Sequence, residues 1–151
     1  MEPTVRVAAR SDVRAIVEML ADDHLGRTRE SLTDPLPETY YTAFEAIDSD
    51  PNHELLVAEL DGRVIGTLQI TYTPSLSHQG SWRATVESVR TVAELRGKGI
   101  GALMMRDAVE RAKARGCKLV QLSTDKSRTD AQRFYERLGF VKSHEGMKLK
   151  L

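Results

Sequence analysis

Hydrophobic and polar positions follow a helical period in the first third of this 151-residue chain. Apolar residues within 13–20 recur at intervals of three and four, which is typical of a helix with one buried face, and Ser11 is a candidate N-cap. A short strand pattern at 4–8 precedes this helix. Residues 26–37 are polar and contain two prolines, so we expect a loop there, followed by a second helix over 38–47.

The middle of the chain changes to strand patterns. Residues 54–60 and 63–72 flank the turn dipeptide Asp61-Gly62, which is a strong signal for a β-hairpin. After a connection at 74–80, residues 82–92 form a third long strand pattern. Three successive strands of this kind predict an antiparallel sheet.

The helical period returns at Ile100 and ends at Gly116, and it appears again over 131–138. A strand pattern at 118–124 separates these two helices, and residues 140–151 close the chain with two further short strand patterns, 140–141 and 146–151. We therefore expect one α+β (α/β layered) domain over residues 1–151. Its mixed, mostly antiparallel sheet should have six to seven strands flanked by about four helices.

Composition narrows the functional classes. Lysine plus arginine and aspartate plus glutamate both number 22, so the net charge is zero and the broad attraction of a nucleic-acid binder is missing. No apolar run approaches the length of a membrane span, and the N-terminus lacks a signal-peptide pattern. Cys117 is the only cysteine, and the four histidines lack metal-ligand spacing. We expect a cytoplasmic protein without a metal or a membrane partner.

The junction between strand 82–92 and the following helix carries the most informative motif. Glycines alternate at Gly97, Gly99 and Gly101, and Arg96 and Lys98 stand between them. Backbone amides without side chains in front of them, at the positive end of a helix, suit a diphosphate. The less specific alternative is a glycine-rich turn with exposed basic residues.

Two other phosphate loops do not fit this motif. A P-loop requires Ser or Thr directly after Gly-Lys, whereas Lys98 is followed by Gly99. A dinucleotide fold requires its glycine motif after the first strand of a parallel unit, and here it follows a late strand.

Arg96-x-x-Gly99-x-Gly101 resembles the acetyl-CoA signature of the GNAT family of N-acetyltransferases. A second segment, from Ala131 through Phe134-Tyr135 to Leu138-Gly139-Phe140, is similar to the second signature of that family. The resemblance implies an acetyl-CoA-dependent transfer of an acetyl group to a primary amine, by direct attack in a ternary complex.

The resemblance also implies which residues bind the donor. The CoA diphosphate maps onto Arg96, Gly97, Lys98, Gly99, Ile100 and Gly101, and the pantetheine arm maps onto the backbone of Thr91 and Val92, where an amide near Val92 would polarise the thioester carbonyl. Strand 120–124 would part from its neighbour to open a slot. Arg128 replaces an asparagine that is frequent in the family, and we expect its guanidinium to reach a CoA phosphate.

By the same resemblance Tyr135 is the general acid that protonates the CoA thiolate, although it also fits an ordinary apolar helical stripe. Glu87 is the candidate general base, directly or through water, or else an exposed carboxylate. Strand alternation places Glu87 and Arg90 on opposite faces unless a bulge intervenes.

Cys117 is expected to be a structural residue at the start of a strand. The acceptor site is expected among acidic residues, arginines and tyrosines of the first two helices and in the late strands. These residues are Asp22, Asp23, His24, Arg27, Arg29, Tyr40, Tyr41, His144 and Glu145.

We expect a small-molecule amine as the acceptor. The alternatives are a protein N-terminus or lysine, and a CoA-binding module without catalysis. By analogy with the family, the late strands are candidates for a homodimer contact.

Overall fold

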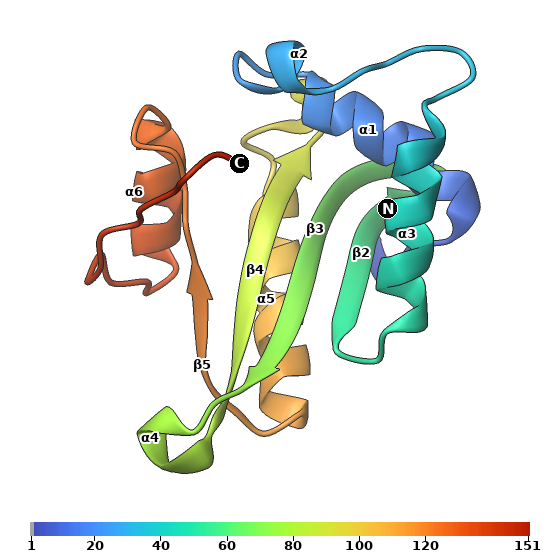
Figure 1. The fold of residues 1–151 in the computed structure, drawn as a ribbon. Helices are drawn as coiled ribbons and strands as arrows, with labels where there is room; N and C mark the ends of the chain where they lie inside the picture. The colour runs from blue at the N-terminus through green and yellow to red at the C-terminus, as the bar shows by residue number, and fades with distance from the viewer. Residues whose placement is uncertain (1) are drawn as a thin grey trace.

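The computed structural model describes residues 2–151; Met1, which the predicted domain includes, lies outside them. Within the described residues, eleven helices and strands follow one another, and Figure 1 shows how they are arranged. They are β1 (Thr4–Val7), α1 (Val13–Ala21), α2 (Gly26–Arg29), α3 (Glu38–Ser49), β2 (His53–Leu60), β3 (Arg63–Pro74), α4 (Ser77–Gly80), β4 (Trp82–Thr91), α5 (Ile100–Ala114), β5 (Cys117–Leu122) and α6 (Thr129–Arg137). Short 3-10 turns at Arg10–Asp12 and Ala93–Leu95 precede α1 and the glycine loop.

The strands form one sheet in the order β1-β2-β3-β4-β5. The first four are antiparallel neighbours, and β5 is parallel to β4. The predicted α+β class with a mixed, mostly antiparallel sheet is confirmed. The predicted hairpin is also confirmed, because β2 and β3 pair on both sides of Asp61 and Gly62.

Each face of the sheet has its own apolar core. On one face, Met104, Met105 and Ala108 of α5 pack against buried β3 residues such as Leu68 and Ile70. On the other face, α1 and α3 cover β2, and Figure 1 shows both helices on the side of the sheet away from α5. The sheet is therefore the middle of three layers. The site lies at the end of the sheet that β4 and β5 form.

A β-bulge interrupts β4 where the predicted base lies. Glu87 pairs with Gln69 and Arg90 pairs with Thr67, so two β4 residues oppose Leu68 alone. Ser88 at the bulge has a φ of 55°, in the left-handed region. Residues directly opposite on paired strands point to the same face, so Glu87 and Arg90 share the α1/α3 face. Simple alternation had predicted opposite faces for these two residues.

The end of the chain differs from the sequence prediction. The sheet has five strands rather than six to seven, and the described residues contain six helices, two of them single turns, rather than about four. Residues 140–151 form no strand, and Met147, Leu149 and Leu151 are almost fully exposed. Their alternating pattern suits a strand, but an isolated strand has no partner for its backbone hydrogen bonds.

None of the helices in residues 2–151 is both long and apolar enough to cross a membrane.

Candidate functional site

The glycine loop has the backbone that the diphosphate prediction requires. Gly97 and Gly99 adopt φ values of 77° and 88°, which strain any residue with a side chain. Gly99 caps α5, and the first bond inside the helix runs from the Leu103 amide to the Gly99 carbonyl at 3.0 Å. The amides of Ile100, Gly101 and Ala102 therefore have no partner within the helix and point out of its positive end.

Within this loop, Arg96 and Lys98 differ from the glycines. Their amides donate long turn bonds of 3.3 Å to the carbonyls of Ala93 and Leu95. The Arg96 guanidinium also donates to the Asp22 carbonyl at 3.0 Å, which ties the loop to the segment after α1. These two residues therefore add positive charge to the loop, while the glycines and the start of α5 offer free amides.

The second part of the site is a slot between β4 and β5. Their parallel pairing starts at Trp82 and Cys117 and stops at Val86 and Leu122, although β4 continues to Thr91. Figure 1 shows the two strands diverging beyond this point, with the chain after β5 leading to α6. The last five residues of β4 thus expose backbone groups along the slot.

The direction of these backbone groups follows from one hydrogen bond. The Val92 amide donates to Ile65 of β3 at 2.9 Å, and the Val92 carbonyl accepts from Leu95 at 3.0 Å. The Val92 amide itself is therefore not free, and the donor that the resemblance implies near Val92 has to be a neighbouring amide. Because successive residues of a strand point their backbone groups to opposite sides, the amides of Thr91 and Val89 face the slot. No sequence pattern indicates the orientation of the Val89 amide, because the bulge at Ser88 interrupts the alternation from which it would be read.

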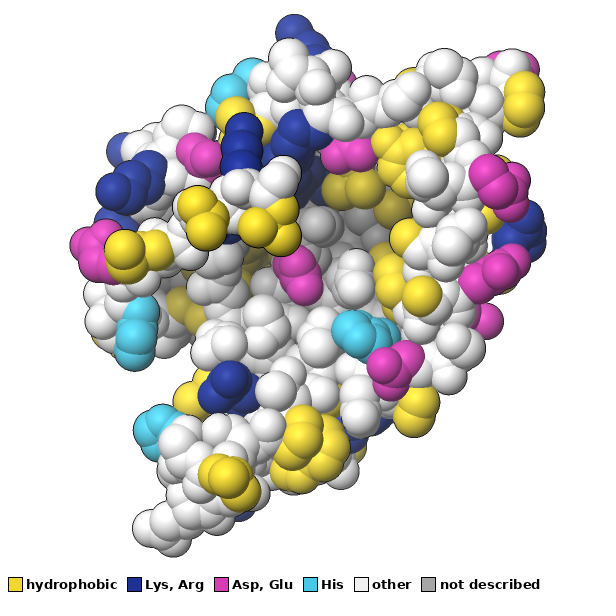
Figure 2. Space-filling model, viewed as in Figure 1, with side chains coloured by type: hydrophobic (Ala, Val, Ile, Leu, Met, Phe, Trp, Pro, Cys, Tyr) yellow, Lys and Arg dark blue, Asp and Glu magenta, His cyan; other side chains and the backbone are white. Residues whose placement is uncertain are grey.

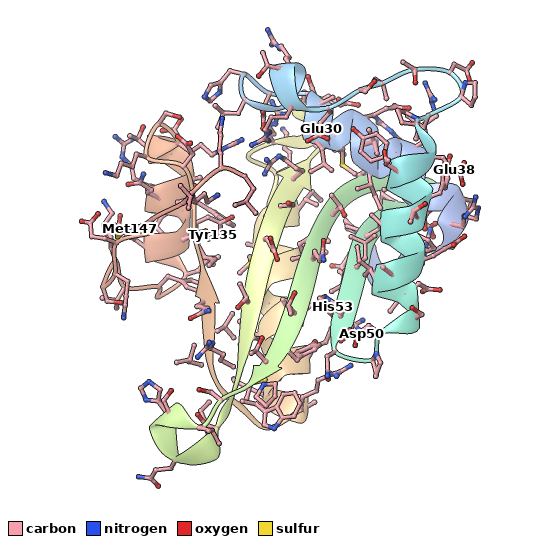
Figure 3. The ribbon with its side chains drawn as sticks, viewed as in Figure 1. Glu30, Glu38, Asp50, His53, Tyr135 and Met147 are labelled. Atoms are coloured by element: carbon pink, nitrogen blue, oxygen red, sulfur yellow. The ribbon has the colours of Figure 1, made fainter. Side chains whose placement is uncertain are left out.

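Tyr135 lies on the side of α6 that faces the slot (Figure 3). Its ring packs edge-on against Phe134 and Phe140, with centroid distances of 5.1 and 5.9 Å. Burial raises the pKa of Tyr135 more than the positive charges of Arg90 and Arg128 lower it. The phenol therefore keeps its proton at neutral pH and is a hydrogen-bond donor beside the slot.

Glu87 is exposed on the α1/α3 face, next to a cavity of about 170 Å³. The cavity is mostly apolar, with Thr67, Gln69 and Ser88 as polar lining residues from the sheet. The remaining lining residues come mainly from α1 and α3, including Ile16, Leu20, Tyr40 and Phe44. Figure 2 shows this face hollowed, with Lys and Arg side chains gathered at one end of the hollow.

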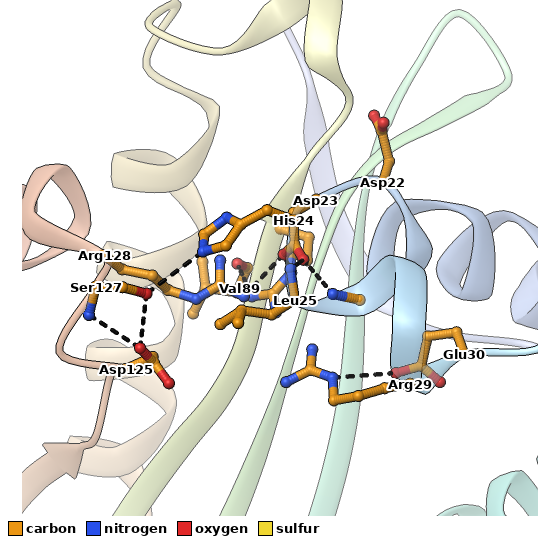
Figure 4. A network of polar contacts seen from close by, with 12 residues as sticks. Asp22, Asp23, His24, Leu25, Arg29, Glu30, Val89, Asp125, Ser127 and Arg128 are labelled. Atoms are coloured by element: carbon orange, nitrogen blue, oxygen red, sulfur yellow. Dashed lines mark hydrogen bonds and ion pairs between the residues drawn. The ribbon is translucent and has the colours of Figure 1, made fainter.

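Asp23 joins three distant segments at that end (Figure 4). Its carboxylate accepts from Arg128 at 2.8 Å and lies 3.2 Å from Nε of Arg90. The amide of Leu25 also donates to it, at 3.0 Å. The sequence placed Asp23 in the acceptor region and Arg128 on a CoA phosphate, but no local pattern could join residues that are 105 positions apart.

Asp23 should also affect stability in a pH-dependent way. Burial alone would raise its pKa, but the Gly26 amide, Arg128 and Arg90 outweigh burial and lower the pKa from 3.8 to about 2. A lowered pKa stabilises the fold above pH 3.8, and this contribution disappears as the pH falls towards 2.

We therefore expect Asp23→Asn to lower the free energy of unfolding by about 2 kcal/mol at pH 7 and by about half as much at pH 3. Urea unfolding of both proteins at the two pH values measures this difference. Asp48→Asn on α3, whose side chain is exposed, is the control, and an equal loss at both pH values would contradict the ion-pair explanation.

A sequence model of the acetyltransferase (GNAT) family matches residues 14–140. The aminoalkylphosphonate N-acetyltransferase of Salmonella typhimurium is 32% identical over 107 residues, which cover 71% of this chain and 69% of that protein. The glucosamine 6-phosphate N-acetyltransferase of Trypanosoma brucei brucei is 31% identical over 91 residues, covering 60% and 59%. A solved structure described as a transcriptional regulator from Bacillus halodurans C-125 is 53% identical, with a TM-score of 0.97 over 99% of this chain and 100% of that one.

Proposed function

Because the chain belongs to the GNAT acetyltransferase family and is thus an acyltransferase that acts on amino groups, we propose that it acetylates the primary amine of a small molecule with acetyl-CoA. The observation that carries this proposal is the slot that opens beyond Val86, between the glycine loop and Tyr135. A thioester lying in that slot would have its diphosphate at the start of α5 and its sulfur near the phenol.

The loop and the slot fit the two ends of the donor. The amides of Gly97, Gly99, Ile100 and Gly101 would bind the diphosphate, with charge added by Arg96 and Lys98. The Thr91 backbone would pair with the pantetheine arm as an added strand would. Whether Arg128 touches a CoA phosphate stays a prediction, since its guanidinium already binds Asp23.

The proposed reaction is direct attack of the neutral amine on the acetyl carbon. Glu87, directly or through water, takes one proton from the ammonium group, and the new C–N bond forms as the carbonyl oxygen gains negative charge. The amide of Val89 faces the slot and is the donor for that oxygen. The C–S bond then breaks as Tyr135 gives its proton to the thiolate, and the excess proton on the new amide nitrogen passes to the Tyr135 phenolate, which restores the phenol.

Position and protonation argue against a covalent intermediate on Cys117. This residue pairs with Trp82 at the opposite end of β5 from the point where the slot opens. Burial raises the pKa of its thiol, which reduces the thiolate fraction at neutral pH. We therefore assign Cys117 to the fold.

A small acceptor fits better than a peptide because the segment between α1 and α3 crosses the end of the slot. Asp22 binds Arg96 there, and Asp23 binds Arg90 and Arg128. A protein N-terminus or lysine would need an open groove at this place. The two curated relatives named above act on small amines, aminoalkylphosphonates and glucosamine 6-phosphate, which supports the same class.

A thiol-release assay with acetyl-CoA and a panel of amines tests the proposal. The panel contains aminoalkylphosphonates, amino sugars and their phosphates, amino acids, polyamines and peptides. We expect CoA release above the amine-free rate with at least one small amine and an acetylated product of matching mass. Release with peptides alone would contradict the small-molecule acceptor, and no release with any amine would contradict catalysis.

A further inference from the structure

Two arginines from separate elements share one carboxylate at the end of the slot. Arg90 comes from β4 and Arg128 from the start of α6, and Asp23 contacts both, at 3.2 and 2.8 Å. The three side chains are 16%, 19% and 13% exposed. Arg29 of α2 is close enough for its charge to act on Arg90. The group is thus a largely buried cluster of positive charge.

This charge is not balanced by the protein. Among residues 2–151, Asp23 is the only carboxylate that forms an ion pair with either Arg90 or Arg128. The buried Nε of Arg90 lies 3.2 Å from the Asp23 carboxylate but without hydrogen-bond geometry, so its N–H has no acceptor, while one of its terminal nitrogens donates to the Val89 carbonyl at 2.9 Å. Burial lowers the pKa of Arg90, and the charges of Arg128 and Arg29 lower it further. A buried cation in this state is stabilised when an anion binds beside it.

The cluster is also close to the proposed reaction. Arg90 directly precedes Thr91, and the bulge at Ser88 turns it to the same face as Glu87. The charges of Arg90 and Arg128 act on the phenol of Tyr135. An anionic group bound here would therefore hold an attached amine within reach of the acetyl carbon.

We propose that Arg90 and Arg128 bind a phosphonate or phosphate group carried by the acceptor amine, with Asp23 holding the two guanidinium groups side by side. The amine part of this inference rests on the proposed function. The anion site rests on the arginine cluster alone. Guanidinium groups bind tetrahedral oxyanions through paired N–H donors, and a dianion balances two cations better than a single carboxylate does. A phosphate of CoA has the same chemistry and is the competing source.

The test is calorimetric titration with methylphosphonate, which has the anion but no amine to acetylate. We expect one site in the wild type, and a dissociation constant at least about tenfold higher in Arg90→Gln. Arg83→Gln, on the same strand but away from the cluster, is the matched control and should bind as the wild type does. Absent methylphosphonate binding, or equal binding by Arg90→Gln, would overturn the proposal.

Titration of Arg90→Gln with acetyl-CoA separates the two sources of phosphate. We expect its dissociation constant to match that of the wild type. A loss as large as the loss for methylphosphonate would assign the cluster to CoA and overturn the acceptor site. Methylphosphonate binding without acetyl transfer to any amine would refute the proposed function and leave the anion site standing.

Thermal unfolding separates binding from a role in the fold. Methylphosphonate should raise the melting temperature of the wild type and of Arg83→Gln but not that of Arg90→Gln, whatever the melting temperature of each protein without the anion. A lower melting temperature with unchanged methylphosphonate affinity would assign Arg90 to the fold.

Discussion

Tyr135→Phe should lower the turnover number about 100-fold to 10,000-fold, the usual contribution of a positioned general acid. The affinity for acetyl-CoA should stay within about twofold, because phenylalanine keeps the ring contacts with Phe134 and Phe140. The raised pKa of Tyr135 means that the wild-type phenol is protonated throughout the neutral range. Steady-state kinetics with the best amine of the panel, together with calorimetric titration of acetyl-CoA, measures both quantities.

Tyr41→Phe is the matched control for this change. The sequence placed Tyr41 in the acceptor region, but the residue lies on α3 with its ring 4.4 Å from the Arg10 guanidinium, and it does not line the cavity beside Glu87. It should retain wild-type turnover. If Tyr135→Phe also turns over at the wild-type rate, Tyr135 is a packing residue of α6 and has no part in proton transfer.

Gly99→Val should weaken acetyl-CoA binding about a hundredfold or more, through loss of at least two charge-assisted hydrogen bonds. At a φ of 88°, a β-branched residue is strained, so the loop must shift and the amides at the start of α5 no longer converge. Calorimetric titration with acetyl-CoA measures the effect.

The chain provides a control with similar backbone strain. Gly62 in the hairpin turn has a φ of 77°, and a side chain there meets no other atom within 4 Å, as at Gly99. Gly62→Val should lose stability but keep acetyl-CoA affinity. Gly101 is unsuitable for this test because an added Cβ would lie 3.2 Å from the ring of Phe134. Equal affinities of Gly99→Val and Gly62→Val would refute the diphosphate assignment.

The sequence predicted the elements that depend on local patterns. The hairpin around Asp61 and Gly62, the helices that begin at Val13 and Ile100, and the antiparallel sheet all follow from periodicity and turn residues. The glycine loop was predicted for the same reason, since its positive φ values at Gly97 and Gly99 are a property of the residue type. At these positions the neighbouring residues alone are sufficient to predict the backbone structure. The predicted N-cap at Ser11 is wrong, because Ser11 lies inside the 3-10 turn Arg10–Asp12 and Asp12 accepts from the Ala9 amide.

The features that the sequence did not predict depend on contacts between distant residues. The bulge at Ser88 moves Arg90 to the opposite face of the sheet, and no residue pattern in β4 predicts this bulge. The cluster of Asp23, Arg90 and Arg128 forms only when α6 comes beside β4. The strand pattern of 146–151 needs a neighbouring strand, and the described chain supplies none. A homodimer that pairs these segments stays a prediction.

Calorimetric titration of the purified wild-type protein with acetyl-CoA tests the central claim most directly. The glycine loop and the slot beyond Val86 predict saturable binding at one site per chain. The absence of binding at millimolar acetyl-CoA, in a sample shown to be folded by circular dichroism, would contradict the proposed acetyltransferase site.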